Sequence, residues 1–234
     1  MLLLPGFLES CLLIAALAAA CAVRPWRMLQ GTGRGLLVPL VASLVLVPVL
    51  WWGWRAPLSL ALGLLGAQFV LLALGWPLAV LVFLAAGVAG AVLGDVSWPG
   101  ALGAALWQGI VPATAGLVAG AALRRAAGPQ PFLYLVGRAF LLPMAATFGV
   151  ACLAHALAGR HEALGDAAPA VFALAGLLDG MFTGMAIALL VLLQPGWVAT
   201  WSDRLYVPGS AAWRHRHEGS APTTRRPAGR LGNH

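Results

Sequence analysis

An acidic residue deep within a long apolar segment is the feature of this sequence most suited to chemistry. Asp179 stands in the run 178–185, Leu-Asp-Gly-Met-Phe-Thr-Gly-Met. A carboxylate at the centre of a bilayer costs at least about 2.5 kcal/mol, so it must face the helix bundle or water, be protonated or be paired. Such a group can bind a cation, relay protons or hold helices together by hydrogen bonds. The sequence leaves the functional and the structural interpretation of Asp179 equally open.

Four further polar residues within apolar segments are candidates to line a substrate path: Gln68, Gln108, Arg138 and Thr183. Amide and hydroxyl groups at such positions also hydrogen-bond between helices without any role in transport. Arg138 is close enough to one end of its segment to extend its guanidinium group to the membrane surface. Its axial offset from Asp179 is roughly 12 Å at about 1.5 Å per residue, so no direct pair is expected unless a helix is tilted or broken.

Three glycines in the segment of Asp179 recur at every fourth position: Gly176, Gly180 and Gly184. Residues four apart lie on one face of a helix. Small residues along one face allow a second transmembrane helix to pack closely against it. We therefore predict that these glycines form a helix-packing face.

Motifs of the common enzyme classes do not occur within the apolar segments. There is no G-x-S-x-G, no H-E-x-x-H and no Walker motif. An intramembrane aspartyl protease needs two membrane aspartates, and Asp179 is the only deep one, since Asp95 lies at a loop. The histidines are scattered, so no metal site is expected. We predict a non-enzymatic protein without a cofactor, in which any ATP-driven step requires a separate ATPase chain.

The composition determines the broad class of the protein. Hydrophobic residues make up 61% of the chain and charged residues 9%, whereas soluble domains carry roughly 25% charged residues. The mean hydropathy is +0.90. A transmembrane β-barrel is excluded because its strands would alternate polar and apolar residues. The sequence therefore predicts an all-α, polytopic transmembrane helix bundle, with membrane lipid as a partner and no role for nucleic acid.

The apolar stretches divide into seven segments of a length that can cross a bilayer core of about 30 Å. They run over 7–23, 36–52, 58–74, 77–93, 101–123, 132–157 and 168–193. The third and fourth are short and are joined by the tight turn Gly75-Trp76-Pro77, so they form either two spans or a re-entrant or buried helical hairpin. Both alternatives leave the sidedness of the other segments unchanged.

Arginines are distributed unevenly between the two sides that this arrangement creates. Eleven lie in the first loop, the fifth loop and the tail, which share one side, and two lie in loops on the opposite side. Because positive loops stay in the cytoplasm, the N-terminus is predicted outside and the C-terminus inside, in a bacterial inner membrane. The chain divides into a transmembrane domain over 1–207 and a disordered basic cytoplasmic tail over 208–234. The spacing of Trp197, Val198, Trp201 and Leu205 predicts a short amphipathic stretch on the membrane surface.

Several short blocks between about residues 60 and 207 carry a resemblance to a known family. The blocks are Leu65-Gly66-Ala67, Leu74–Ala79, Gly94-Asp95, Pro131–Tyr134, Asp179–Met185 and Pro195–Trp201, followed by Asp203 and Tyr206. They resemble an uncharacterised family of bacterial inner-membrane proteins related to the permease component of energy-coupling-factor ABC transporters of the cobalt/nickel type. The resemblance implies a permease fold, and as partners a transmembrane coupling protein and ATPase subunits.

The metal ligands of those permeases have no counterpart in this chain. The position of a ligating histidine near the N-terminus is Leu2, and the positions nearest to a second one are Leu62, Gly63 and Leu64. Cobalt and nickel prefer imidazole and amine nitrogen, which the apolar segments hardly offer. The leading hypothesis is an integral membrane permease, the substrate-binding component of an energy-coupling-factor-type transporter, with no substrate named. The alternative is a non-transporting membrane scaffold or accessory subunit.

Overall fold

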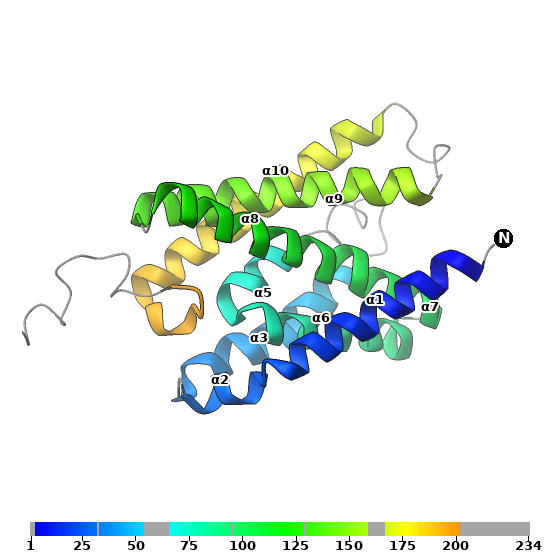
Figure 1. Ribbon diagram of the computed structural model, residues 1–234, viewed down its shortest axis with the longest axis horizontal. Helices are drawn as coiled ribbons and strands as arrows, with labels where there is room; N and C mark the ends of the chain where they lie inside the picture. Colours follow the sequence, from blue (N-terminus) through cyan, green and yellow to red (C-terminus); the bar gives the residue numbers. More distant parts are fainter. Residues whose placement is uncertain are drawn as a thin grey trace, which may run out of the picture.

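A computed structural model of the chain describes residues 3–31, 33–53, 66–94, 96–128, 130–158 and 167–201 (Figure 1). All regular secondary structure in these ranges is helical, which confirms the all-α prediction. The predicted tail over 208–234 lies outside the described residues, as does Asp95.

The helices follow the predicted apolar segments along the chain. They are α1 (Leu3–Ala22), α2 (Pro25–Gly31), η1 (Gly33–Leu36), α3 (Leu37–Trp52), α5 (Ala67–Leu74), α6 (Trp76–Leu93), α7 (Trp98–Ala104), η2 (Ala105–Ile110), α8 (Val111–Ala127), η3 (Leu133–Leu141), α9 (Leu142–Ala158), α10 (Ala168–Leu193) and η5 (Pro195–Trp197). The short helix α2 lies in the first predicted loop.

Within the described ranges, four helical stretches are long and apolar enough to cross a membrane: Trp76–Leu93, Trp98–Ala127, Leu133–Leu157 and Ala168–Leu193. The apolar parts of α1 and α3 are shorter. Of the third predicted segment the structure describes only α5, whose eight residues extend about 12 Å at 1.5 Å per residue. This helix does not cross a bilayer by itself.

Two of the long stretches contain a wider π-helical section, which the sequence analysis did not predict. The sections η2 and η3 end just before Pro112 and Pro143. A proline has no N–H group to donate, and its ring collides with the carbonyl group four residues earlier. The chain avoids this collision by a local π-helical turn, and π-helical turns are frequent at functional sites.

The short helix α5 lies at the centre of the molecule. It packs against α6, α8, α10 and α3, and in Figure 1 it lies between the long pair α9 and α10 on one side and α1 and α3 on the other. Seven of its eight residues are buried. Gly66 and Gly75 flank it with φ angles of 92° and 80°, which glycine adopts readily and other residues avoid. These glycines allow the chain to begin and end a helix abruptly inside the protein.

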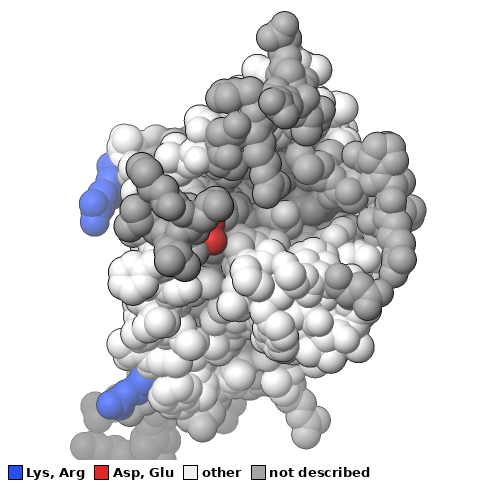
Figure 2. Space-filling view, turned by 90° about the vertical axis from the view of Figure 1, so that its right-hand side faces the viewer, with Lys and Arg blue, Asp and Glu red and all other residues white. Residues whose placement is uncertain are grey.

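Much of the outer surface is apolar. In Figure 2 the described residues of one face are almost all uncharged, with basic side chains at separate points near its edge. On α10, Met181, Met185, Leu189 and Leu192 are each more than half exposed. These four residues follow helical spacing and form an outward face, opposite the glycines of the same helix. An exposed face formed by several large apolar side chains is typical of contact with lipid or with another protein.

Candidate functional site

The carboxyl group of Asp179 is fully buried and joins three helices. Its Oδ1 accepts a hydrogen bond from the backbone N–H of Gly66 at 3.0 Å and from the Thr183 hydroxyl at 3.4 Å, and its Oδ2 accepts one from the Thr147 hydroxyl at 2.6 Å. Gly66 precedes α5, Thr147 belongs to α9 and Thr183 lies one turn further along α10. Both carboxyl oxygens are therefore occupied by groups of the protein itself.

The bond to Gly66 caps the N-terminus of α5. The first N–H groups of a helix have no partner within the helix, and its N-terminus carries a partial positive charge. Burial removes water as an alternative acceptor. The carboxyl oxygen of Asp179 therefore accepts the hydrogen bond of an N–H group that has no acceptor within α5. Asp179 thus stabilises an otherwise unfavourable helix start inside the bundle.

The other end of α5 is held by the segment that follows α10. The backbone N–H of Ala199 donates to the carbonyl of Ala73 at 2.8 Å, and the Thr200 hydroxyl donates to the carbonyl of Leu72 at 2.7 Å. Val198 is buried in a cluster with Leu72. These contacts satisfy carbonyl groups that the last turn of a helix leaves unpaired.

The described part of the predicted amphipathic stretch, up to Trp201, does not form an amphipathic helix, and Val198 is buried in the protein. After the short turn η5 the chain is extended at Val198, with φ −109° and ψ 100°. The carbonyl groups at the end of α5 offer hydrogen bonds that a surface helix would not make, and Val198 gains burial. The spacing of Trp197, Val198 and Trp201 did not reveal this, because the partner lies over 120 residues earlier.

Tyr134, near the start of η3, contacts the segment that follows α10. Its hydroxyl group lies 2.7 Å from the Thr200 hydroxyl, and its ring meets the ring of Trp201 edge-on at 4.9 Å between centroids. Tyr134 itself is almost fully buried. Polar and aromatic contacts of Tyr134, Thr200 and Trp201 therefore hold the C-terminal end of α5.

Gln68 fixes the side of α5 that faces α8. Its side-chain amide donates to the backbone carbonyl of Pro112 at 2.5 Å, and the residue is 2% exposed. Gly116 faces this amide and leaves space for it, because a Cβ atom there would collide with the Gln68 side chain. Gln68 acts here as a contact between helices, close to the Asp179 end of α5.

The three glycines of α10 lie directly against η3 and α9. A Cβ atom on Gly176 would lie 2.6 Å from the backbone oxygen of Met144, and one on Gly180 would lie 2.8 Å from that of Phe140. At Gly184 the nearest atom is Phe140 Cβ, at 3.2 Å. The absence of side chains on this face brings the two helix backbones together and places Asp179 beside Thr147.

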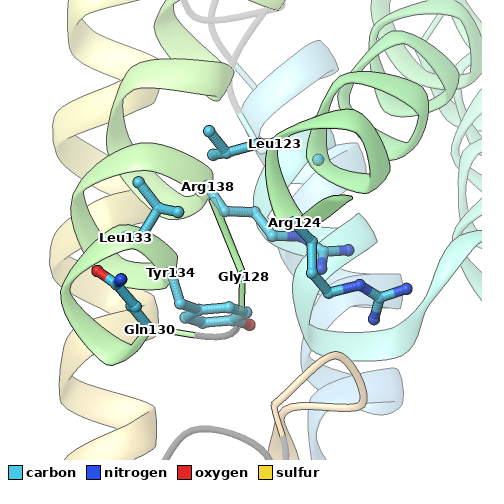
Figure 3. Close-up of a pocket in the computed structure, with 8 residues that line it drawn as sticks. Leu123, Arg124, Gly128, Gln130, Leu133, Tyr134 and Arg138 are labelled. Carbon is cyan, nitrogen blue, oxygen red and sulfur yellow. The ribbon is translucent and has the colours of Figure 1, made fainter. Parts of the chain in front are cut away.

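Arg138 lies apart from the Asp179 cluster. It lines a small open pocket between α8 and η3, together with Arg124, Gln130 and Tyr134 (Figure 3). Since Thr147 bonds to Asp179 and is nine positions after Arg138 on the same long helix, the two charges are separated by about 13 Å along that helix. Asp179 and Thr183 thus lie at the N-terminal end of α5, which itself carries Gln68. Arg138 lies elsewhere, between α8 and η3.

Gln108 is half-buried in η2, one turn before Pro112. Within the described ranges its side chain makes no hydrogen bond to the Asp179 cluster, whereas Thr114 of α8 accepts a hydrogen bond from the indole N–H of Trp76 at 2.9 Å. Two residues of the site, Thr147 and Thr200, were not among the candidates predicted from the sequence. Thr147 carried the same signal as Thr183, a hydroxyl within an apolar segment, but its partner was not apparent from spacing.

Comparison of the chain with protein-family models, with curated proteins and with solved structures gave no match.

Proposed function

We propose that this chain is an integral membrane permease, the substrate-binding component of an energy-coupling-factor-type transporter. Its partners are a transmembrane coupling protein and ATPase subunits, because the chain carries no Walker motif of its own. The proposal names no substrate, since the histidines that bind cobalt or nickel in the metal permeases are replaced here by Leu2 and by apolar residues around 62–64.

The observation that carries the proposal is the meeting of the resembling blocks at α5. Gly66, from the first block, donates to Asp179, from the block 179–185. Thr200, from the last block, bonds at the opposite end of α5 and contacts Tyr134. Blocks spread over more than 130 residues of sequence therefore hold one short helix. Here a short helix is buried in the bundle with its termini held by polar groups, and many transporters build substrate sites at the ends of short helical segments inside the membrane.

The arrangement suggests how Asp179 takes part in transport. In the described state its carboxyl group is bonded to the N-terminus of α5, so no oxygen is open to a substrate. A substrate with a positive charge or a strong hydrogen-bond donor competes with the Gly66 N–H for that oxygen. Release of Gly66 then loosens the N-terminal end of α5, while the hydrogen bonds of Thr200 keep the C-terminal end in place.

The proposal predicts a specific complex. A tagged chain extracted in mild detergent from its own host is expected to carry a membrane protein and nucleotide-binding subunits with Walker motifs, identified by mass spectrometry. The purified complex is expected to hydrolyse ATP. A chain that purifies alone from membranes in which it is folded, with no ATPase in the fraction, would contradict the transport function.

The second candidate function is a non-transporting scaffold or accessory subunit, and one observation favours it. Both oxygens of Asp179 are bonded to the protein, and the residue is fully buried. Such a carboxyl group serves helix packing without any ligand. The two functions differ in whether the charge of Asp179 matters beyond folding, which the substitutions described in the Discussion measure.

For the membrane arrangement we propose seven spans across the bacterial inner membrane. The N-terminus lies outside and the C-terminus lies on the cytoplasmic side. Four helical stretches of sufficient length and the largely uncharged face of Figure 2 support insertion. The unequal distribution of arginines supports the orientation. The eight-residue helix α5 makes the third segment the one that departs most from a simple crossing, and the same orientation holds if it and α6 form a hairpin.

Reporter fusions test this orientation. A reporter active only in the cytoplasm is expected to be active when fused after His234 and silent when inserted at Asp166. The reason is that the arginine-rich loops and tail remain on the cytoplasmic side. Immunoblots that show equal amounts of both fusions are the control. Activity at Asp166 with silence at His234 would contradict the orientation.

A further inference from the structure

Two arginines from different helices line the same pocket at one end of the bundle. Arg124 belongs to the last turn of α8 and Arg138 to η3, and the chain between these helices passes through Gly128 and Gln130, which also line the pocket. Figure 3 shows both guanidinium groups directed to the same side, with the ring of Tyr134 beneath. The pocket is thus a small basic recess that opens at the surface.

The guanidinium group of Arg138 lacks a negative partner among the described residues. Its Nε is buried and has no hydrogen-bond acceptor there, and its Cζ lies 5.8 Å from the centre of the Tyr134 ring. A buried N–H group without an acceptor is unfavourable, as is the approach of two like charges. The pocket therefore has positive charge in excess, which an anion with several acceptor oxygens neutralises.

Phosphate is the anion that fits this donor set. A guanidinium group offers N–H donors in a planar fork that matches pairs of phosphate oxygens, and two such groups surround one phosphate. Gln130 also lines the pocket, but its side-chain amide is directed away from the two guanidinium groups (Figure 3). Gly120 leaves room beside the fork, since a Cβ atom there would lie 3.0 Å from Arg138 Nε.

The surroundings favour the phosphate of a lipid over a soluble one. Leu141, one turn deeper in the membrane than Arg138 on the same helix in the proposed orientation, exposes 46% of its surface, which suits an acyl chain below a headgroup. In the proposed orientation the end of α8 lies at the cytoplasmic leaflet, where basic pockets between transmembrane helices bind anionic headgroups.

We propose that the pocket between α8 and η3, with the guanidinium groups of Arg124 and Arg138, binds the phosphate group of an anionic phospholipid. The site rests on the proposed membrane insertion but does not depend on transport, on the partner subunits or on Asp179.

The test measures lipid-dependent thermal stability of the purified full chain in detergent. Phosphatidylglycerol and cardiolipin are compared with phosphatidylcholine, and inorganic phosphate is a separate arm. The anionic lipids are expected to raise Tm by several degrees over phosphatidylcholine, with little effect of inorganic phosphate. Arg138→Gln and Arg124→Gln are each expected to remove more than half of that rise.

Arg125→Gln is the matched control, because Arg125 adjoins Arg124 and carries the same charge but does not line the pocket. It is expected to keep the full rise in Tm. If Arg138→Gln does not fold, Arg124→Gln, at an exposed position, provides the measurement. Equal losses in Arg125→Gln and Arg124→Gln would show unspecific attraction to the surface and overturn the site. An equal response to inorganic phosphate would overturn the lipid as its ligand, and the absence of any preference for anionic lipid would overturn both.

Discussion

Replacing Gly180 with leucine is expected to destabilise the folded chain by more than about 3 kcal/mol, because the new side chain overfills the contact between α10 and η3. Even a single Cβ atom at this position would lie 2.8 Å from the carbonyl oxygen of Phe140 and 3.1 Å from Met144 Cβ. Neither atom is the flexible end of a side chain, so the helices must separate. Separation also breaks the bond between Asp179 and Thr147. The measurement is Tm in detergent, together with the yield of monodisperse protein.

Gly149→Leu is the matched control for this substitution. Gly149 is an exposed glycine within α9, and a Cβ atom there would meet nothing within 4 Å. A leucine at this position is expected to leave Tm unchanged or to raise it slightly, because glycine is a poor helix former. Similar losses in both variants would show that any leucine is harmful in this part of the bundle, and similar tolerance would show that Gly180 does not face a close helix contact.

Replacing Asp179 with alanine is expected to destabilise the chain on the order of 2–5 kcal/mol, because two buried donors lose their acceptor. These are the backbone N–H of Gly66 and the hydroxyl group of Thr147. Asp179→Asn is expected to cost about 1 kcal/mol or less. Its amide oxygen can still accept from Gly66, while the Thr147 hydroxyl turns to accept from the amide nitrogen. Tm of the purified variants in the same detergent gives the comparison.

The asparagine variant also separates the two proposed functions. In a transporter whose site needs the ionisable group, Asp179→Asn is expected to fold normally and to abolish complementation of a host that lacks the gene. In a scaffold it is expected to fold and complement. A stability loss as large as that of Asp179→Ala would contradict the hydrogen-bonding scheme itself, since the amide would then have failed to replace the carboxyl group.

Much of the architecture could be predicted from local sequence. Long apolar segments bounded by Gly, Pro and Arg determine where helices begin and end, because burial of apolar surface and the pairing of backbone groups act over a single helix length. The spacing of Gly176, Gly180 and Gly184 indicated one face of α10 in the same way. The polar residues Asp179, Gln68 and Arg138 were recognisable because each is costly in an apolar environment.

The partners of those residues depend on the tertiary structure. Asp179 finds Gly66 and Thr147 because the glycine face of α10 lets α9 approach, and because the chain places the start of α5 next to both. No periodic pattern encodes a bond between residues 113 positions apart. The same holds for the segment around Thr200, whose spacing suggested a surface helix. The carbonyl groups in the last turn of a short buried helix have no partner within the helix and require other donors. That requirement arises only once α5 is enclosed by the rest of the chain.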